Sequence, residues 1–282
     1  MTIAITGATG QLGRLIVERL KTRVEPARLR ALVRTPAKAA DLGIQALEAD
    51  YDRPSTLAAA LAGVDTLMLV SSSEVGRRTA QHRHVIEAAR AAGVRRIVYT
   101  SLLRADTSAL SLAGEHRDTE RMLKDAGLGW TILRNGWYTE NYMGSVAGAL
   151  AGGELVGTVG QGRIASASRA DYAAAAAVVL TEAGHEKQTY ELAGDTAYTL
   201  EELAAELSRQ TGRTIPYRHV PEADYAAFLA AHGLPLELAR AIASWDAEAS
   251  RGALYDDGRR LSRLIGRPTT PLADSVTAAL NA

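Results

Sequence analysis

A glycine-rich turn close to the N-terminus is the feature that most constrains the fold of this chain. An apolar segment, residues 2–6, leads into the run Gly7-Ala8-Thr9-Gly10-Gln11-Leu12-Gly13, and a helical pattern follows over 11–22. At a first strand–turn–helix junction, glycines at this spacing permit a tight turn, close approach of the backbone to a diphosphate and close packing of helix on strand. Free N–H groups at the helix N-terminus favour an anion. We therefore expect a dinucleotide at residues 7–13, although the glycines could also serve a sharp turn alone.

Strand and helix patterns alternate through the first two thirds of the chain. The apolar spacing predicts strands at 2–6, 28–34, 44–49, 65–70, 97–100, 130–133 and 189–192, and helices at 11–22, 57–61, 80–92, 115–126 and 170–180. Strands that alternate with helices form βαβ units and a parallel sheet. The expected fold class is therefore α/β, a Rossmann-type doubly wound parallel sheet with a smaller, mainly helical C-terminal lobe.

The pattern changes after residue 134. Residues 144–162 are rich in glycine, which predicts a loop with short strands, and the chain from residue 200 onward is mainly helical with prolines between the helices. We expect an NADP-binding Rossmann domain over 1–135, to whose sheet residues 168–195 return. The smaller, substrate-side lobe is expected to contain 136–167 and 196–282.

Charge and composition exclude several classes of function. Lysine plus arginine and aspartate plus glutamate both number 32, so there is no net charge to favour nucleic acid or an anionic membrane. The chain has no cysteine, which excludes disulfides and thiolate chemistry. No apolar run approaches the roughly 20 residues that cross a bilayer, and His82 and His84 are spaced wrongly to share a metal on a helix. We expect a cytoplasmic protein without a metal site, and a homodimer is compatible with the sequence.

The residue after the second expected strand indicates which nicotinamide cofactor is bound. NAD-binding domains usually place an acid there for the ribose 2′-hydroxyl, whereas this chain has Arg34, with Lys38 following. A guanidinium binds a 2′-phosphate as a charge-assisted pair, so the sequence favours NADPH, although Arg34 is one of many surface arginines. Asp50, after the third strand, could accept from the adenine amino group or cap the turn before Pro54.

A familiar catalytic pair is missing from the sequence. None of the ten tyrosines is followed by lysine four residues later, so the tyrosine acid that short-chain dehydrogenases use for ketones is absent. Reduction of a ketone creates a strongly basic alkoxide that needs a positioned acid. Reduction of a quinone creates a much less basic hydroquinone anion, which a few hydrogen bonds can stabilise. The absence therefore favours a flat, electron-poor acceptor held against the nicotinamide by orientation alone.

Four further strings carry a family resemblance. They are Ser71-Ser72-Ser73-Glu74-Val75-Gly76, Thr100-Ser101-Leu102-Leu103, Leu133-Arg134-Asn135-Gly136-Trp137-Tyr138 and Ser168-Arg169-Ala170-Asp171-Tyr172. With the glycine turn and Val33-Arg34, they resemble the NmrA-like branch of the atypical short-chain dehydrogenases, and within it the bacterial NADPH-dependent quinone reductases and their triphenylmethane-reducing relatives. The resemblance covers nearly the whole chain. It implies two-electron reduction of a quinone by NADPH without a flavin.

The resemblance also implies positions for the ligand contacts. Residues from Gly7 to Leu12 and Arg34 would hold the adenosine and the phosphates. Ser72, Ser73, Glu74, Val75 and Gly76 would line the nicotinamide ribose, although a serine run there could equally form a turn. The cofactor and substrate cleft would be closed by Arg169 and by the run Tyr138, Thr139, Glu140, Asn141, Tyr142 and Met143.

The candidates for the chemical step are Asn135, Tyr138 and His116. Asn135 and Tyr138 follow the sixth strand and offer hydrogen bonds to a developing oxyanion, and Trp137 or Tyr138 offers a face for a quinone ring. His116 could donate a proton near neutral pH. Structural alternatives remain for each, since Trp137 could be core, Ser101 could cap a turn and His116 could be a surface residue. The alternative function is a non-catalytic NADP(H) sensor of the NmrA type.

Overall fold

The computed structural model describes residues 1–281, and contacts within the chain separate two units. The first unit consists of Met1–Asp106, Leu112–Asn135 and Arg169–Leu192, and the second of Thr107–Ser111, Gly136–Ser168 and the residues from Ala193 onward. The predicted domains differ from these units at 107–111, 168 and 193–195, which the prediction assigns to the nucleotide-binding domain and the contacts group with the second unit.

A seven-stranded parallel sheet forms the centre of the first unit, with the order β3-β2-β1-β4-β5-β6-β8. Its strands are β1 (Ile3–Thr6), β2 (Leu29–Val33), β3 (Gln45–Glu48), β4 (Thr66–Leu69), β5 (Arg96–Leu102), β6 (Gly129–Asn135) and β8 (Gln188–Leu192). All the expected strands of this unit are present, with ends within a few residues of the predicted ones. The expected fold class is confirmed.

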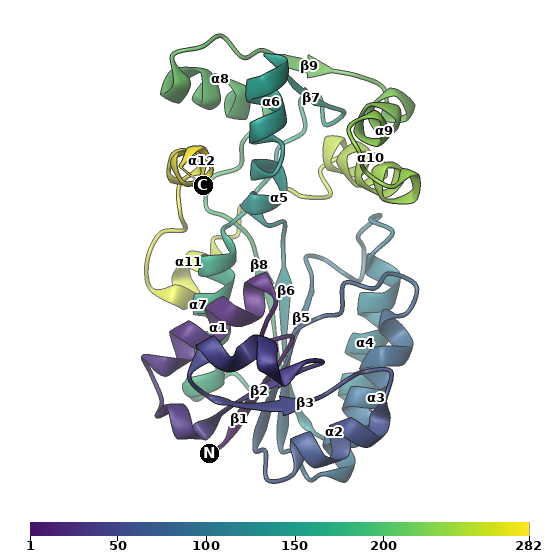
Figure 1. Cartoon of the computed structure of the whole chain (residues 1–282), viewed down its shortest axis with the longest axis vertical. Coiled ribbons are helices and arrows are strands. Elements are labelled where there is room, and N and C mark those ends of the chain that lie inside the picture. The colour runs from purple at the N-terminus through teal and green to yellow at the C-terminus, as the bar shows by residue number, and fades with distance from the viewer. Residues whose placement is uncertain (282) are drawn as a thin grey trace. The chain divides into compact units, whose positions relative to one another are not determined.

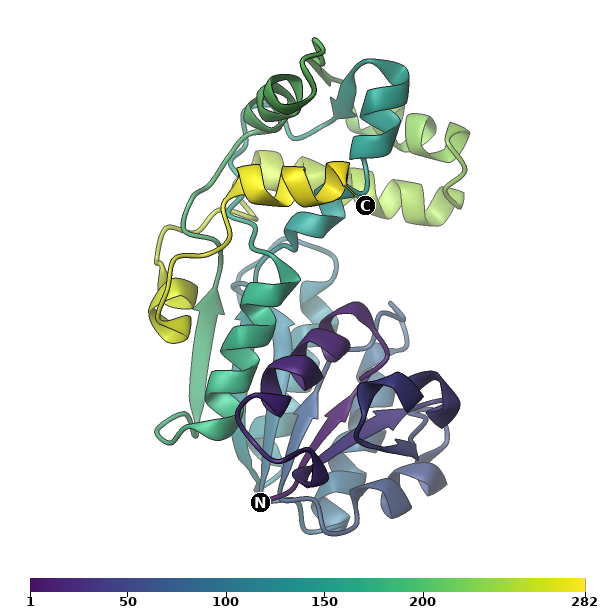
Figure 2. The same cartoon turned by 60° about the vertical axis from the view of Figure 1, so that its left-hand side comes forward.

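Helices cover both faces of this sheet. They are α1 (Gln11–Lys21), α2 (Pro54–Leu61), α3 (Arg78–Ala91), α4 (Ala113–Asp125) and α7 (Arg169–Thr181), with short 3₁₀ turns at Pro26–Arg28 and Pro36–Leu42. Helices α1 and α7 pack side by side on one face, and α3 packs between α2 and α4 on the other (Figure 1; Figure 2 shows α1 and α7 from a second direction). Because helices cover both sides, β1 and β4 are buried at every position, as their predominantly apolar sequences predict.

The strand order creates a switch point between β1 and β4. From β1 the chain winds outward through β2 and β3, then returns to β4 and continues the other way through β5, β6 and β8. At such a switch point the loops after the two strands leave in opposite directions, which creates a crevice at the carboxyl ends of open α/β sheets. Open α/β sheets bind their ligands at such a crevice, and both the glycine turn and Ser71–Gly76 begin there.

The second unit is mainly helical, with one small sheet. Its elements are α5 (Thr139–Met143), α6 (Val146–Gly152), β7 (Leu155–Gly157), α8 (Leu200–Thr211), β9 (Tyr217–His219), α9 (Glu222–Ala231), α10 (Leu236–Ser250), α11 (Arg260–Ile265) and α12 (Leu272–Leu280). Strand β7 pairs in parallel with β9. Helices α9 and α10 pack together and, with Val156 and Val220, form an apolar cluster.

One prediction for this unit is partly wrong. Residues 144–162 contain the short strand β7, as expected, but Val146–Gly152 forms helix α6 instead of loop. Val146 and Ala149, spaced three residues apart, are both buried and give this segment an apolar helical face. Packing of that face outweighs the helix-weakening glycines at 148 and 152. None of the helices within residues 1–281 is long and apolar enough to cross a membrane.

Candidate functional site

The glycine turn is folded so that the start of α1 lies against the end of β1. Gly7 has a φ of +58°, a conformation that favours glycine, and the N–H of Gly10 donates to the carbonyl of Gly7 at 2.8 Å. A Cβ at residue 13 would lie 2.2 Å from the Gly7 oxygen, so only glycine allows this approach. The loop also lies beside β4, because a Cβ at residue 7 would be 3.7 Å from Cβ of Val70.

The N-terminus of α1 is suited to an anion. Gly10 caps this helix without a side-chain hydrogen bond, and its first turn contains no acidic residue. The first amides of a helix lack intrahelical acceptors and carry the positive end of the helix dipole. Because Gly10 has no side chain, Thr9 is small and no carboxylate is present in the first turn, these amides can bind a ligand such as a diphosphate.

The loop Ser71–Gly76 follows β4 on the other side of the switch point and is held by several hydrogen bonds. The backbone N–H of Ser71 donates to Oγ1 of Thr100 at 2.8 Å, and that of Gly76 donates to Oε1 of Glu115 at 3.1 Å. The hydroxyl of Ser72 accepts from the N–H of Glu74 at 3.2 Å. Val75 is 57% exposed at the tip of the loop. The loop is therefore fixed at both ends and open at its tip.

Three buried side chains of α3 position this loop, and none of them was predicted from the sequence as a site residue. Nε of Arg78 donates to the carbonyl of Ser72 at 2.7 Å, while its Nη1 pairs with Glu115 at 2.9 Å. Nε2 of His82 accepts from the N–H of Ser72 at 3.0 Å. Gln81, beside them, has its amide oxygen 2.5 Å from the hydroxyl of Ser72. Polar residues at positions 78, 81 and 82 share one helical face, and that spacing is the signal that could have identified them.

Arg34 and Asp50 lie at the carboxyl ends of β2 and β3. The Arg34 side chain is 74% exposed and its Nη1 is 3.3 Å from Oε1 of Glu74. Both carboxylate oxygens of Asp50 take part in the adjoining turn, since Oδ1 accepts from the N–H of Asp52 and Oδ2 accepts from Nε of Arg53. Burial raises the pKa of Asp50, but the Arg53 hydrogen bond and the Asp52 amide outweigh it and the net shift is downward. The turn-capping role of Asp50 is thus visible, and its contact with adenine stays a prediction.

Asn135 is the last residue of β6 and is only 3% exposed. Its backbone carbonyl accepts from the N–H of Leu103 at 2.9 Å, but its side-chain oxygen has no hydrogen-bond partner among residues 1–281. A buried acceptor without a donor costs about 1–3 kcal/mol. The side chain is therefore ready to accept a hydrogen bond from a ligand or a water molecule at the carboxyl end of the sheet.

His116 and Ser101 lie in the interior of the first unit. Nδ1 of His116 is 2.6 Å from the hydroxyl of Tyr99, and burial first, then Arg78 and His82, hold its pKa well below the usual value. The lowered pKa favours the uncharged imidazole near neutral pH, and proton donation by His116 stays a prediction. Ser101 donates to Oε1 of Glu120 at 2.6 Å.

Glu120 in turn binds Arg134 with two hydrogen bonds, at 2.9 and 2.7 Å. Nη1 of Arg134 also reaches Glu191 at 2.8 Å and Asp106 at 3.0 Å. Burial lowers the pKa of Arg134, but the Glu120 hydrogen bond, which is the larger effect, raises it. Ser101 therefore belongs to a buried ion-pair network that joins α4, β6 and β8.

The run from Tyr138 to Met143 belongs to the second unit. Tyr138 precedes α5 and forms an isolated parallel β-bridge with Ala167. Thr139 is buried, and its hydroxyl lies 2.8 Å from that of Ser166. Glu140 and Met143 are half-buried and Asn141 is exposed. Tyr142 is buried and donates to Oδ1 of Asp246 at 3.0 Å.

Trp137 packs edge-on against Trp245, with ring centroids 5.8 Å apart, and indole Nε1 of Trp245 donates to Ser111. Arg169, by contrast, begins α7 in the first unit. Ligand contacts by these residues stay predictions. Within residues 1–281, no three histidine, aspartate or glutamate side chains come together as a metal site would require.

The switch point, the glycine turn and the anion-ready helix end define a Rossmann-type dinucleotide-binding protein. A family model described as NAD(P)H-binding matches residues 7–183, more than half of the chain. The chain therefore belongs to this NAD(P)H-binding family, in its NmrA-like group, as predicted.

Relatives and solved structures agree with this family. Quinone oxidoreductase 2 of Escherichia coli is 56% identical over 282 residues, covering 99% of each chain, and an NAD(P)H azoreductase of Xenophilus azovorans is 30% identical over 98% of this chain and 97% of its own. The E. coli NADPH-dependent quinone oxidoreductase complexed with NADPH has a TM-score of 0.97, with 99% of this chain and 100% of that chain covered. A Citrobacter triphenylmethane reductase, 36% identical, has a TM-score of 0.95 with both chains fully covered.

Proposed function

We propose that this protein is an NADPH-dependent quinone oxidoreductase that delivers two electrons to a quinone by direct hydride transfer, without a flavin or a metal. The observation that carries the proposal is the diphosphate cradle, the turn Gly7–Gly13 that follows β1. In this turn residue 13 lies so close to Gly7 that it cannot carry a side chain. The similarity of 56% over the full length to a protein named quinone oxidoreductase 2 supports the choice of acceptor.

The residues of the first unit fit the parts of NADPH. The turn Gly7–Gly13 and the first amides of α1 would hold the diphosphate, because they offer N–H donors and no competing carboxylate. Arg34, exposed beyond β2, would pair with the ribose 2′-phosphate. The loop Ser71–Gly76 would lie over the cofactor and line the nicotinamide ribose, with the side chain of Glu74 turned toward Arg34, since the loop leaves the neighbouring strand β4 and is held by Arg78 and His82.

Hydride transfer to a quinone requires few catalytic groups from the protein. When bound, NADPH supplies a hydride from its nicotinamide ring. The hydroquinone anion that results is weakly basic, so hydrogen bonds and water can neutralise it without the acid that a ketone requires. Asn135 is buried at the end of β6 with an unsatisfied amide oxygen, so it would accept a hydrogen bond from a water molecule or from a hydroxyl of the hydroquinone once that oxygen is protonated.

The test is turnover with a series of simple benzoquinones, followed by the loss of nicotinamide absorbance, with NADPH and NADH in parallel. We expect oxidation of NADPH to depend on the quinone, to slow when the transferred C4 hydrogen is deuterium, and to proceed in protein without a flavin spectrum. Binding of NADPH without turnover of any quinone would identify a sensor of NADP(H) instead. A flavin that co-purifies and is required for activity would contradict direct transfer.

A binding measurement tests the cofactor site independently of activity. Arg34→Asp places a carboxylate where the 2′-phosphate is expected, so NADPH should bind at least about tenfold more weakly while NADH changes little. Arg83→Asp, at an exposed position on α3, is the matched control and should bind both cofactors like the parent. Equal loss of NADPH and NADH affinity in Arg34→Asp would show that Arg34 does not read the phosphate.

A further inference from the structure

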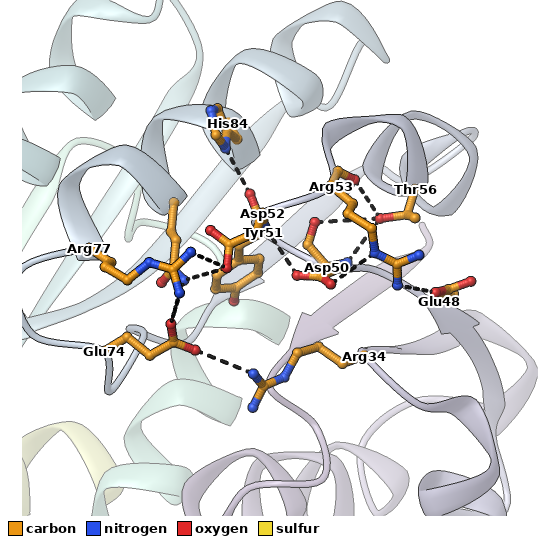
Figure 3. Close-up of polar contacts among 11 residues, drawn as sticks. Arg34, Glu48, Asp50, Tyr51, Asp52, Arg53, Thr56, Glu74, Arg77 and His84 are labelled. Atoms are coloured by element: carbon orange, nitrogen blue, oxygen red, sulfur yellow. Dashed lines mark hydrogen bonds and ion pairs between the residues drawn. The ribbon is translucent and has the colours of Figure 1, made fainter.

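Glu74 lies between two guanidinium groups that come from different parts of the chain. Its Oε1 is 3.3 Å from Nη1 of Arg34, beyond β2, and its Oε2 is 3.0 Å from Nη1 of Arg77, just before α3. Figure 3 shows the three side chains pointing toward one another above the strand ends. Nε2 of Gln81 also donates to Oε2 at 3.0 Å. The carboxylate therefore accepts from two cations and an amide.

Both cations are accessible to a ligand. The side chains of Arg34 and Arg77 are 74% and 61% exposed, against 34% for Glu74. Nη2 of Arg77 also pairs with Asp52 at 2.9 Å, so two carboxylates hold its guanidinium beside Glu74. The anion in the middle is thus partly covered, while the cations that hold it face solvent.

The position of this ion pair matters as much as its chemistry. Strands β2 and β4 flank β1 in the sheet, so the contact between Arg34 and Glu74 spans the carboxyl end of β1, where the glycine turn begins. A dinucleotide whose diphosphate lies on that turn sends its adenosine ribose toward the end of β2. The Arg34–Glu74 contact lies on that route, so Glu74 and the 2′-phosphate would compete for the same guanidinium.

We propose that Arg77 is a second reader of the 2′-phosphate and that Glu74 holds its place between Arg34 and Arg77 until NADPH arrives. This inference rests on the proposed cofactor site and adds to it a specificity residue and an exchange of anions. An exposed ion pair contributes only about 0–1 kcal/mol, so Glu74 is displaced at low cost. A phosphate monoester carries about −1.5 to −2 charge and three acceptor oxygens, enough to engage both guanidiniums at once.

The exchange makes discrimination depend on Arg77. NADH has no 2′-phosphate, so Glu74 stays ion-paired with Arg34 and Arg77 when NADH binds. With the phosphate, both arginines gain a stronger anion, and Arg77 should contribute to NADPH binding while leaving NADH unaffected. Removing the charge of Glu74 should free both cations and favour the phosphate further.

The experiment measures the binding of 2′,5′-ADP and 5′-ADP to the full-length protein by titration calorimetry. The variants are Arg77→Gln, Glu74→Gln and Arg34→Gln. Arg95→Gln is the matched control, because Arg95 is also exposed (70%) and ion-paired, with Asp65. It precedes β5 and so lies at the amino ends of the strands, away from the proposed cofactor site. Thermal unfolding of each variant verifies that the fold is kept.

We expect Arg77→Gln to weaken 2′,5′-ADP binding roughly tenfold, which corresponds to about 1.4 kcal/mol, and to leave 5′-ADP unchanged. Glu74→Gln should strengthen 2′,5′-ADP binding about threefold, within the range of an exposed ion pair. Arg77→Gln binding 2′,5′-ADP like the parent, or Glu74→Gln binding it more weakly, would overturn the inference. If Arg34→Gln no longer distinguishes 2′,5′-ADP from 5′-ADP while Arg77→Gln still does, the role of Arg77 is refuted and the proposed cofactor site stands. If the parent protein binds neither nucleotide, the proposed cofactor site itself is refuted.

Discussion

The backbone N–H of Ser72 donates to Nε2 of buried His82 across 3.0 Å, and Nδ1 of the same ring lies 3.0 Å from the hydroxyl of Thr119. Because Nε2 accepts, the ring is neutral and its proton resides on Nδ1. Burial, and to a lesser extent Arg78, lowers the pKa of His82 to about 3. A core histidine thus fixes the loop that follows β4 at the switch point.

Replacing this histidine should weaken both the fold and cofactor binding. His82→Leu leaves the N–H of Ser72 without its acceptor, and an unsatisfied buried donor costs about 1–3 kcal/mol. We expect the free energy of unfolding to fall by that amount in urea titrations and the Kd for NADPH to rise, because the loop Ser71–Gly76 loses its anchor. Arg83→Gln, on the exposed side of the same helix, should change neither quantity. A His82→Leu protein with the parent's stability would contradict the anchoring role.

The same histidine should make the protein sensitive to acid. The pKa of His82 falls from 6.5 to about 3 in the folded state, so the unfolded chain binds more protons between these values. Its stabilising contribution is complete above about pH 6.5 and is lost as the pH falls toward 3. His116, with a lowered pKa, acts in the same direction. Urea unfolding at a series of pH values should show this decline, and the decline should be shallower in His82→Leu; an equal slope in both proteins would rule out His82 as its source.

Asp246 in the second unit should act in the opposite direction. Burial raises the pKa of this carboxyl to about 7, and the hydrogen bond from the Tyr142 hydroxyl partly offsets the shift. The hydroxyls of Tyr198, Tyr217 and Tyr225 also interact electrostatically with it. The folded state therefore binds the extra proton between about pH 3.8 and pH 7, and stability declines as the pH rises through that window. One carboxylate oxygen, Oδ2, has no partner among the described residues, so ionisation is costly there.

Asp246→Asn removes that ionisation while its amide oxygen can still accept from Tyr142. We expect the stability of the variant, relative to the parent, to be greater at about pH 8 than at about pH 5. Chemical unfolding at the two pH values is the measurement. Asp257→Asn, near an exposed loop, is a control that should show little dependence on pH. A difference between Asp246→Asn and the parent that is the same at both pH values would mean that the carboxyl is already ionised at the lower one.

Gly13→Ala should disturb the cradle directly. The new Cβ would lie 2.2 Å from the Gly7 oxygen and 2.9 Å from Cα of Ala8, so α1 must move away from the end of β1. Overpacking of this kind costs about 1–3 kcal/mol, and the displaced turn should lose affinity for NADPH. Gly148→Ala in α6 meets nothing within 4 Å and should be neutral or slightly stabilising. Thermal unfolding and NADPH titration of both variants test the cradle, and normal NADPH binding by Gly13→Ala would refute it.

Sequence by itself determined the sheet and the glycine turn. These features are local or periodic. An apolar strand followed by glycines at fixed spacing and an amphipathic helix needs no knowledge of distant residues, since backbone sterics and hydrophobic spacing already specify the unit. The position of Arg34 after β2 could be read in the same way, because parallel strands bring their carboxyl ends to one edge of the sheet.

Only the tertiary structure decided what the polar side chains between the elements do. His116 and Ser101 have sequence positions typical of active-site residues, but long-range packing surrounds them with Tyr99 and Glu120 and withdraws them into the interior. Arg77 and Glu74 are three residues apart, yet their meeting with Arg34 depends on how β2 and β4 flank β1. These hydrogen bonds and ion pairs act over a few ångströms between residues 17 to 40 positions apart, and no local pattern encodes that proximity.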